Sequence, residues 1–392
     1  MHLLHISSGL DPRTGGTASA AITMAIAARR GGAEVTLVTA GALTETQARQ
    51  LAENQIVIRA FPFCRWLGSL AAEWGISPRL HLWVWLNLGD YDGVLAHSPF
   101  VLTSFLALIT SRLRRRRLVL VSHEGLTLFV RRNGKRSYTI LLKEILTRIY
   151  GRFANRILFA SDLERLNSGM ERHYDSHRLV VLALPVIDEL RLARPRRPTT
   201  NSDALTVGFL GRIHPKKNLH LLVAAVAALP QVRLIISGAG DEALEERIKT
   251  MIRQKKLSER VEWLGFIQDA AKVEFFARID LLVVPSIFES FAMVAAEAMG
   301  HSVPVMLSPT VGVAEWVERH GGGMIVPPRP DALVVAIARL ERESLRELGL
   351  RAETVARENF SYKNFGLLLT ELFAAEIAKP KPGRRHRQVP LD

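Results

Sequence analysis

Two glutamates eight positions apart mark the segment of this sequence that is best suited to chemistry. Glu289 and Glu297 lie in Pro-Ser-Ile-Phe-Glu-Ser-Phe-Ala-Met-Val-Ala-Ala-Glu, residues 285–297. The apolar run 281–284 predicts a buried strand, and residues 291–300 predict an apolar helix that follows it. Carboxylates accept hydrogen bonds from sugar hydroxyls, and a helix start offers N–H groups to a polyhydroxylated or anionic ligand. The segment therefore favours binding of such a ligand.

The predicted helix places Glu289 in the loop before it and Glu297 about two turns inside it. A carboxylate in an apolar helix is costly unless it has a partner. Glu297 therefore binds a ligand or pairs with a nearby arginine, and this segment alone does not decide between the two.

A cationic loop follows the first strand of the second half: Gly-Arg-Ile-His-Pro-Lys-Lys-Asn, residues 211–218. A guanidinium and an ammonium group, here Arg212 and Lys217, together suit a diphosphate and neutralise charge on a leaving nucleotide. We expect Lys216 to be solvated. The alternative is a basic loop without a ligand, but its place at the carboxyl end of a parallel strand favours binding.

Two further groups of residues follow strands in the first half. Gly15, Gly16 and Thr17 precede the first helix, where glycine permits close approach to a phosphate or sugar, although a plain tight turn also explains them. His97 and His123 each end an apolar strand and either donate to a sugar hydroxyl or are structural. No His/Cys/carboxylate grouping has metal-ligand spacing, so we expect no metal.

Both halves alternate strands with helices, which predicts two doubly wound α/β domains. The expected strands are 3–6, 35–38, 56–60, 93–96, 118–121, 156–160, 205–210, 232–237, 261–264, 281–284 and 303–307, with helices at 18–30 and 219–228 among others. We expect domains at 1–190 and 204–361, joined by a polar linker at 191–203. Ligands of such sheets bind in the cleft beyond the strand carboxyl ends.

Length and composition agree with this organisation. At 392 residues the chain suggests two domains, and 48% hydrophobic residues exclude a disordered protein. The lone Cys64 excludes an internal disulfide and is compatible with a reducing compartment. The N-terminus lacks the features of a secretory signal. The uncharged stretch 93–111 is interpreted as a strand and a helix, not as a membrane span.

The net charge is +14, and 13 lysines and arginines lie between Arg112 and Arg156 against two glutamates. A basic field can serve nucleic acid, anionic lipid or an anionic substrate. Residues 138–153 alternate apolar and basic residues at helical spacing. This pattern fits a helix on a membrane surface or one packed on its own domain with a solvated basic face. Residues 379–392 are expected to form a disordered basic tail.

The paired glutamates, the Gly-Arg…Lys loop and the early Gly-Gly-Thr occur in an order that resembles the retaining nucleotide-sugar glycosyltransferases of family 4, which have the GT-B fold. The resemblance runs from Leu3 to about Phe373. It implies an α/β fold with two Rossmann-like domains facing a central cleft and a C-terminal helix, 362–378, that packs back on the first domain. It also implies transfer of a hexose from a UDP- or GDP-sugar to a hydroxyl acceptor, without a metal.

The resemblance also assigns roles. Arg212 and Lys217 would hold the donor diphosphate, Glu297 the ribose, and Glu289 the sugar near its reacting carbon. The residues implied in catalysis are Glu289, His123, Arg212 and Lys217; those in donor binding are Gly16, Arg212, Lys217, Ser290, Phe291, Ala292 and Glu297; those in acceptor binding are Gly15, Gly16, Thr17 and His97.

The chain departs from the family pattern in two places. Ala292 stands where the family usually has glycine, so a methyl group enters where the backbone meets the sugar. The neighbours of His123, Glu124 and Gly125, also differ from the commoner ones.

The acceptor and the compartment are less constrained. The basic first half suggests a lipid-linked saccharide at the inner face of the plasma membrane, with the protein cytoplasmic or peripheral there. The alternatives are a sugar-nucleotide epimerase of the same architecture and a basic nucleic-acid-binding protein, although no recognition motif for nucleic acid is present.

Overall fold

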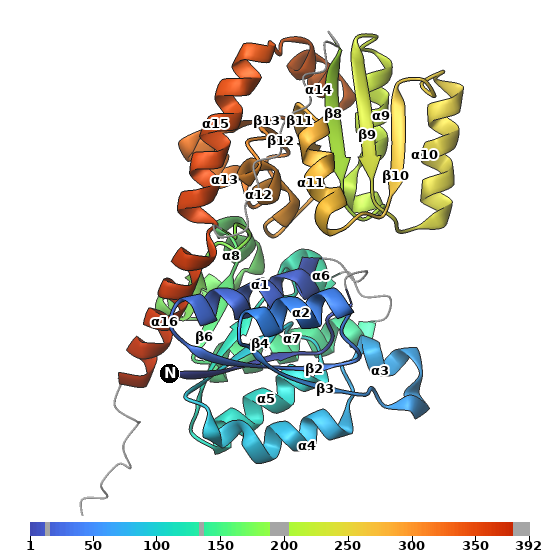
Figure 1. The fold of residues 1–392 in the computed structure, drawn as a ribbon. Coiled ribbons are helices and arrows are strands. Elements are labelled where there is room, and N and C mark those ends of the chain that lie inside the picture. Colours follow the sequence, from blue (N-terminus) through green and yellow to red (C-terminus); the bar gives the residue numbers. More distant parts are fainter. Residues whose placement is uncertain (12–15, 133–136, 189–203, 379–392) are drawn as a thin grey trace, which may run out of the picture.

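The structure is a computed structural model that describes residues 1–11, 16–132, 137–188 and 204–378. The expected linker 191–203, the expected tail 379–392 and Gly15 lie outside the described residues. Two parallel sheets, each with helices packed on its faces, lie one above the other in Figure 1. We call residues 1–188 the N-lobe and residues 204–359 the C-lobe.

The N-lobe sheet has the order β3-β2-β1-β4-β5-β6-β7, with all neighbours parallel. Its strands are β1 (His2–Ser7), β2 (Glu34–Ala40), β3 (Val57–Phe61), β4 (Gly93–His97), β5 (Arg117–Val121), β6 (Arg156–Phe159) and β7 (Leu179–Val181). Its helices are α1 (Gly16–Arg30), α2 (Glu45–Glu53), α3 (Ser69–Glu73), α4 (Pro78–Asn87), α5 (Leu102–Leu113), α6 (Leu128–Arg132), α7 (Ser137–Phe153) and α8 (Asp162–Ser168). The first six strands were predicted, whereas the short β7 was not.

The C-lobe sheet has the order β10-β9-β8-β11-β12-β13 and is also parallel. Its strands are β8 (Leu205–Leu210), β9 (Val232–Ser237), β10 (Val261–Gly265), β11 (Leu281–Val284), β12 (Val305–Leu307) and β13 (Gly323–Ile325). Its helices are α9 (Leu219–Ala227), α10 (Glu242–Gln254), α11 (Asp269–Arg278), α12 (Met293–Gly300), α13 (Ala314–His320), α14 (Pro330–Ala338) and α15 (Arg342–Asn359). Here β13 was missed, and β12 begins later than predicted because Pro304 has no N–H to donate to a neighbouring strand.

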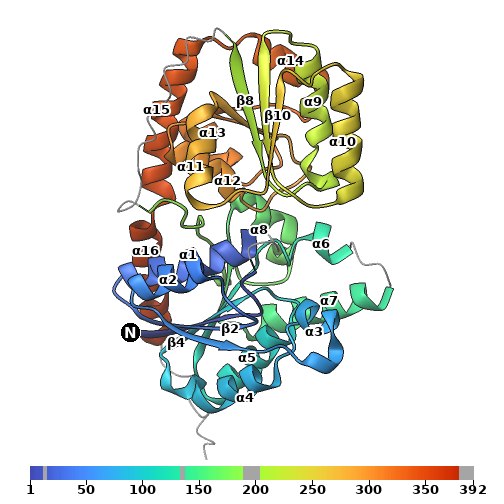
Figure 2. The ribbon, with the colours of Figure 1, turned by 45° about the vertical axis from the view of Figure 1, so that its right-hand side comes forward.

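The last helix, α16 (Tyr362–Ala378), returns to the N-lobe and packs along α1 (Figures 1 and 2). The two helices touch through glycine: a Cβ on Gly366 would overlap the carbonyl oxygen of Ala27, and a Cβ on Gly31 would overlap the Gly366 backbone. Phe373 lies further along α16, where a Cβ on Gly93 would overlap its ring. Small residues at these points let the helix lie directly against the N-lobe core.

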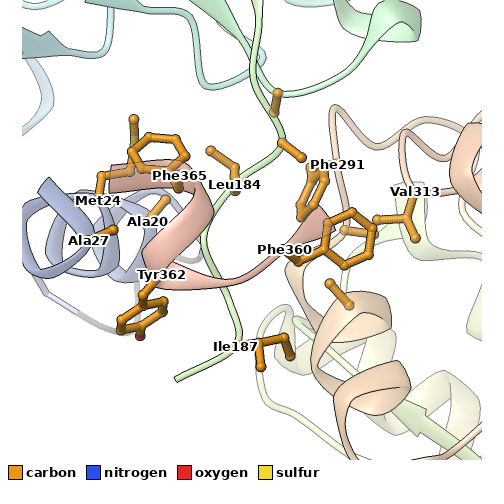
Figure 3. Packing of buried hydrophobic residues seen from close by; sticks show 14 of the residues in the cluster. Ala20, Met24, Ala27, Leu184, Ile187, Phe291, Val313, Phe360, Tyr362 and Phe365 are labelled. Carbon is orange, nitrogen blue, oxygen red and sulfur yellow. The ribbon is translucent and has the colours of Figure 1, made fainter. Parts of the chain in front are cut away.

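The segment at 184–188, where the chain leaves the N-lobe, and the segment at 359–362, where it returns, run side by side (Figure 3). The N–H groups of Val186 and Ile187 both donate to Phe360 O, at 2.8 and 2.9 Å, and Tyr362 N donates to Ile187 O at 3.0 Å. The Phe360 ring packs edge-on against Phe291, with 5.3 Å between centroids. The crossing is therefore packed directly against the segment that carries the paired glutamates.

Within the described ranges, no helix is long and apolar enough to span a bilayer. The uncharged stretch 93–111 forms β4 and most of α5, as predicted, although the helix begins at Leu102.

Candidate functional site

Four segments that follow strands meet where the lobes touch. Residues 122–124 and 160–162 follow β5 and β6 of the N-lobe, and residues 211–218 and 285–292 follow β8 and β11 of the C-lobe. The contacts that join them across the lobes include Lys216 with Glu124 and Ser161 with Ser290, and Phe129 of α6 stacks on Phe288 beside them. The sequence predicted three of these four segments as site elements and missed 160–162.

The cationic loop is tied to the glutamate segment. The Asn218 side chain, from a residue with φ of 53°, donates to Pro285 O at 3.0 Å, and Ile287 N donates to Lys216 O at 2.8 Å. Lys217 Nζ then lies 2.5 Å from Glu289 Oε1. Burial raises the pKa of Glu289, but the ammonium groups of Lys217 and Lys216 outweigh it, so the pKa lies below its usual value. Glu289 is thus an anion held beside a cation.

The prediction that Lys216 is solvated is wrong. Its Nζ lies 2.8 Å from both carboxylate oxygens of Glu124 in the N-lobe, and the two side chains are 14% and 17% exposed. Burial raises the pKa of Glu124 and Lys216 lowers it, with a net rise to which Glu289 contributes. The prediction failed because only the tertiary structure brings Glu124 to this loop. Two lysines and two glutamates therefore form one cluster across the lobe contact.

Arg212 lies on the same loop and is exposed. Desolvation lowers the pKa of His214, and the charges of Arg212, Lys216 and Lys217 lower it further. A Cβ on Gly211 would lie 3.9 Å from Lys217 Nζ, which places the Lys217 ammonium beside the start of the loop. The structure thus places Arg212 and Lys217 on one loop, with Lys217 partly buried and Arg212 at the surface.

Helix α12 begins at Met293 because Ala292 adopts the left-handed conformation, with φ of 77° and ψ of 72°. Glu297 consequently lies little more than one turn into the helix, not two as predicted. Its carboxylate pairs with Lys272 of α11 at 2.5 Å, so the protein partner is a lysine and not an arginine. Side-chain exposures of 32% for Lys272 and 22% for Glu297 leave this pair open to a ligand.

The backbone carbonyl oxygens of residues 289–291 all accept hydrogen bonds within the protein. Gly312 N donates to Glu289 O, the Ser161 hydroxyl donates to Ser290 O at 2.6 Å, and Val313 N donates to Phe291 O. A Cβ on Gly312 would overlap Ser290 O, so this close approach requires glycine. Because these carbonyl oxygens already accept hydrogen bonds, a sugar bound by the predicted residues Ser290, Phe291 and Ala292 would accept hydrogen bonds from their backbone N–H groups.

The two predicted histidines lie together but differ in exposure. His97 Nδ1 is 2.9 Å from His123 Nε2, and the rings stack with centroids 5.2 Å apart. His123 is partly buried, whereas His97 is fully buried and also lies 5.6 Å, centroid to centroid, from the buried His5. Burial lowers the pKa of His123 to about 4. His97 thus contacts His123 from a fully buried position, and its acceptor-binding role stays a prediction.

The predicted glycine loop is described only from Gly16, which is exposed and begins α1; Thr17 follows it, partly buried. A Cβ on Gly16 would lie 3.8 Å from the Met293 sulfur. The starts of α1 and α12 therefore face each other across the lobe contact. Gly15 is outside the described residues.

Ser161 and Glu315 bond across the lobes and Glu164 bonds to N-lobe turns, and none of the three was predicted as a site residue from the sequence. Glu315 accepts from Asp162 N at 3.1 Å across the lobes, and burial raises its pKa. Ser161 and Glu164 have the Ser-x-x-Glu spacing of a capping box, a sequence signal that could have identified them.

Among the described residues, no group of three or more His, Cys, Asp or Glu side chains is arranged to hold a metal ion. A hollow of about 550 Å³ lies elsewhere, on α13 and α15 of the C-lobe, and is lined by Arg319, Leu350 and Glu358 among others. None of the predicted site residues lines it.

Comparison with known proteins gives two family matches. Residues 193–359 match the model described as glycosyl transferases group 1, and residues 14–186 match glycosyltransferase family 4. The D-inositol 3-phosphate glycosyltransferase of Nocardia farcinica is 31% identical over 185 residues, 44% of this chain and 40% of that protein. An uncharacterized glycosyltransferase of Methanocaldococcus jannaschii is 27% identical over 192 residues, 46% of this chain and 47% of that protein. The chain spans about half the length of the curated relatives it matches.

Solved structures share the fold along nearly the whole chain. Anabaena HepE, in complex with UDP, superposes with a TM-score of 0.74 at 21% identity, covering 96% of this chain and 100% of that one. Sucrose-phosphate synthase from Thermosynechococcus elongatus superposes with a TM-score of 0.75 at 20% identity, covering 96% and 99%. The two family matches together with this shared two-sheet fold show that the chain belongs to the group 1 glycosyltransferases of the GT-B type.

Proposed function

We propose that the protein transfers a hexose from a UDP- or GDP-sugar to a hydroxyl acceptor, with retention of configuration, at the Lys217–Glu289 site. The observation that carries the proposal is the 2.5 Å pair of Lys217 Nζ and Glu289 Oε1, with Arg212 on the same loop. HepE has been solved with UDP and with UDP-glucose, which supports a uridine nucleotide.

The pair can exchange partners when the donor binds. A diphosphate that reaches Lys217 competes with Glu289 for the ammonium group, which releases the carboxylate to accept hydrogen bonds from sugar hydroxyls. In the transfer, the bond from the anomeric carbon to the diphosphate breaks and the bond to the acceptor oxygen forms on the same face. The acceptor proton passes to the departing diphosphate. Lys217 and Arg212 neutralise the charge that develops there, and no metal is required.

The nucleotide is tested by thermal unfolding with UDP, GDP, ADP and their sugar conjugates. A ligand at about 100 times its Kd stabilises the folded state by about 2.7 kcal/mol. We expect UDP or GDP to raise the melting temperature and Lys217→Ala to abolish the rise. No stabilisation by any of the three nucleotides would contradict the proposal.

Product analysis separates transfer from epimerisation. A transferase converts the nucleotide-sugar to a nucleoside diphosphate and a glycoside only when an acceptor is present. Free epimerised donor formed without an acceptor would instead identify an epimerase.

We further propose that the acceptor is a lipid-linked saccharide at an anionic membrane surface, the inner face of the plasma membrane. Helix α5 contacts both α4 and α7 in the N-lobe. Arg114 lies over the Trp85 ring and Arg112 over the Phe153 ring, at 5.9 and 5.8 Å. Exposed apolar side chains on these helices are Leu82, Trp85, Leu86, Ile109, Leu113, Leu141, Leu142, Ile145 and Phe153.

Helix α7 thus packs on its own domain, through Thr147 and Tyr150, and also leaves apolar residues exposed among basic ones. Apolar side chains interleaved with arginines suit the interface of an anionic bilayer. This surface supports the proposed acceptor because it would bring a lipid-linked substrate to the N-lobe.

Flotation with vesicles tests the membrane proposal. Vesicles with anionic lipid should carry the protein at low salt and release it at high salt, because screening weakens the attraction. The double variant Leu82→Ser with Leu86→Ser should float less. Val335→Ser removes an apolar side chain that is 50% exposed on the C-lobe and should float like the wild type. Absence of flotation at low salt would remove the proposal.

A further inference from the structure

Glu164 of α8 is a fully buried carboxylate for which the sequence predicted no role. Its Oε1 accepts from Glu124 N at 2.5 Å, and its Oε2 accepts from Ala160 N at 2.7 Å. The Ser122 side chain is also hydrogen-bonded to it. One carboxyl group therefore joins the turn after β5 to the turn after β6.

The turn after β5 is held in an unfavourable backbone conformation. His123 has φ of 44° and Glu124 has φ of 71°, two consecutive left-handed residues that are not glycine. Such a conformation costs about 1–2 kcal/mol per residue and persists only where its surroundings hold it. The second of these residues, Glu124, donates its backbone N–H to Glu164, and this hydrogen bond helps to hold the turn.

Both turns carry contacts that matter at the lobe interface. The His123 ring stacks on His97, and Glu124 pairs with Lys216 of the C-lobe, whose neighbour Lys217 pairs with Glu289. The second turn continues into Ser161, whose hydroxyl donates to Ser290 O in the glutamate segment. A shift of Glu164 would therefore displace residues on two sides of the site.

Helix capping alone does not account for this arrangement. In a capping box the third helical residue bonds back to the N–H of the cap residue, here Ser161. The cap bond, in which Glu164 N donates to the Ser161 hydroxyl oxygen, is present at 3.1 Å, but the Glu164 carboxylate accepts from Ala160 N and Glu124 N. The side chain is thus used to join two turns.

We infer that Glu164 is a positioning residue that holds the His123–Glu124 turn in its left-handed conformation and so places His123 and the Glu124 carboxylate at the sugar-transfer site. Its effect on activity rests on the proposed function, whereas its effect on the turn does not.

The first test compares Glu164→Gln with Glu376→Gln. The amide introduced at position 164 keeps the shape of the carboxylate but cannot accept from two N–H groups with both of its ends. We expect kcat to fall about tenfold or more, because small misplacement of reacting groups is costly. KM for the nucleotide-sugar should change less than about twofold, because all the predicted donor-binding residues except Gly16 lie on the C-lobe.

Glu376 is the matched control. It is a buried glutamate that pairs with Arg156 at the opposite end of β6, away from the site. Glu376→Gln should destabilise the protein but keep kcat within about twofold of the wild type. The inference is overturned if Glu164→Gln keeps wild-type kcat, or if both variants lose kcat equally at equal loss of stability.

The second test measures unfolding and needs no activity. Glycine adopts a left-handed conformation without the cost of a side chain, so Glu124→Gly removes the need to hold residue 124 there. Glu164→Gln should therefore destabilise the Glu124→Gly protein less than the wild type in a double-mutant cycle. If Glu164→Gln alone does not fold, the Glu124→Gly background should restore folding. Additive effects, or no restoration, would overturn the inference.

The two failures are distinguishable. If the wild-type protein transfers sugar from no nucleotide-sugar, the proposed function is wrong. The double-mutant cycle of Glu164→Gln and Glu124→Gly then still tests the role of Glu164. A wild-type protein with transfer activity and an additive cycle defeats only the inference about Glu164.

Discussion

Lys216 Nζ binds both carboxylate oxygens of Glu124 at 2.8 Å and so joins the lobes beside the proposed site. The neighbours of these two residues in the chain serve the site itself. Lys217 pairs with Glu289, and His123 precedes Glu124. The residues that join the lobes are therefore neighbours in the chain of the residues proposed for the chemistry. A change in the contact between the lobes would move the proposed catalytic residues as well.

The cross-lobe pair should contribute measurably to stability. Glu124→Gln and Lys216→Met should each lower the free energy of unfolding by about 1–2 kcal/mol, because each leaves a partly buried charge without its partner. In urea unfolding, the double variant should be more stable than the sum of the single effects predicts, with a coupling of about 1 kcal/mol. The exposed pair Lys249 and Glu246 is the control, and its coupling should stay below about 0.5 kcal/mol. Equal coupling in both pairs would contradict this prediction.

Lys217→Ala should reduce kcat/KM for the nucleotide-sugar by about 10²–10³, equivalent to roughly 2.7–4 kcal/mol of transition-state stabilisation. The reason is loss of the ammonium group beside the leaving diphosphate. Steady-state kinetics measure the effect, and Lys249→Ala on α10 should keep the wild-type value. Wild-type turnover in both Lys217→Ala and Glu289→Ala would show that the site is assigned wrongly.

Ala292→Gly should not destabilise the protein and should add up to about 1 kcal/mol of stability, because Ala292 has φ of 77°. The same substitution at Ala295, inside α12, should cost about 1 kcal/mol because glycine is a poor helix former. Opposite signs in thermal unfolding would confirm the strain at 292, and destabilisation by both substitutions would refute it.

The buried histidines should make the folded state sensitive to acid. Burial lowers the pKa of His5 from 6.5 to about 3. Between these values the unfolded chain binds more protons than the folded one, so the contribution of His5 is constant above pH 6.5 and stability is lost as pH falls below it.

His5→Leu removes this titration and isolates the effect. In urea unfolding from pH 8 to pH 5, the wild type should lose stability relative to His5→Leu by about 1.4 kcal/mol per pH unit below pH 6.5. A pH-independent difference between the two proteins would show that His5 is not buried in its neutral form.

The fold was largely predictable because each strand of a parallel sheet buried on both faces is a short apolar run. The predicted strands at 205–210, 232–237 and 281–284 begin and end at the same residues as β8, β9 and β11. The misses, β7 and β13, are three residues long, and neither strand is fully buried. Such short segments do not differ from loops in sequence.

The start of α12 shows a second reason why sequence-based prediction fails. Residues 291–300 are apolar and helix-forming in sequence, but Phe291 packs against Trp316 and Phe360 in the tertiary core. The chain accommodates this packing with a left-handed Ala292, which shifts the helix start by two residues. Local preference was overridden by contacts that are distant in sequence.

The order of the amino acids was enough to predict which chemical groups are available and which strand each one follows, because apolar runs, glycines and charges act locally. The pairings are set by the folded protein: Lys216 with Glu124, His97 with His123, and Glu164 with the turns after β5 and β6. The first two pairings join residues 92 and 26 positions apart, and the bond from the turn after β5 to Glu164 joins residues 40 positions apart. Their energies depend on distance and burial in the folded protein, and neither quantity is encoded in the local pattern.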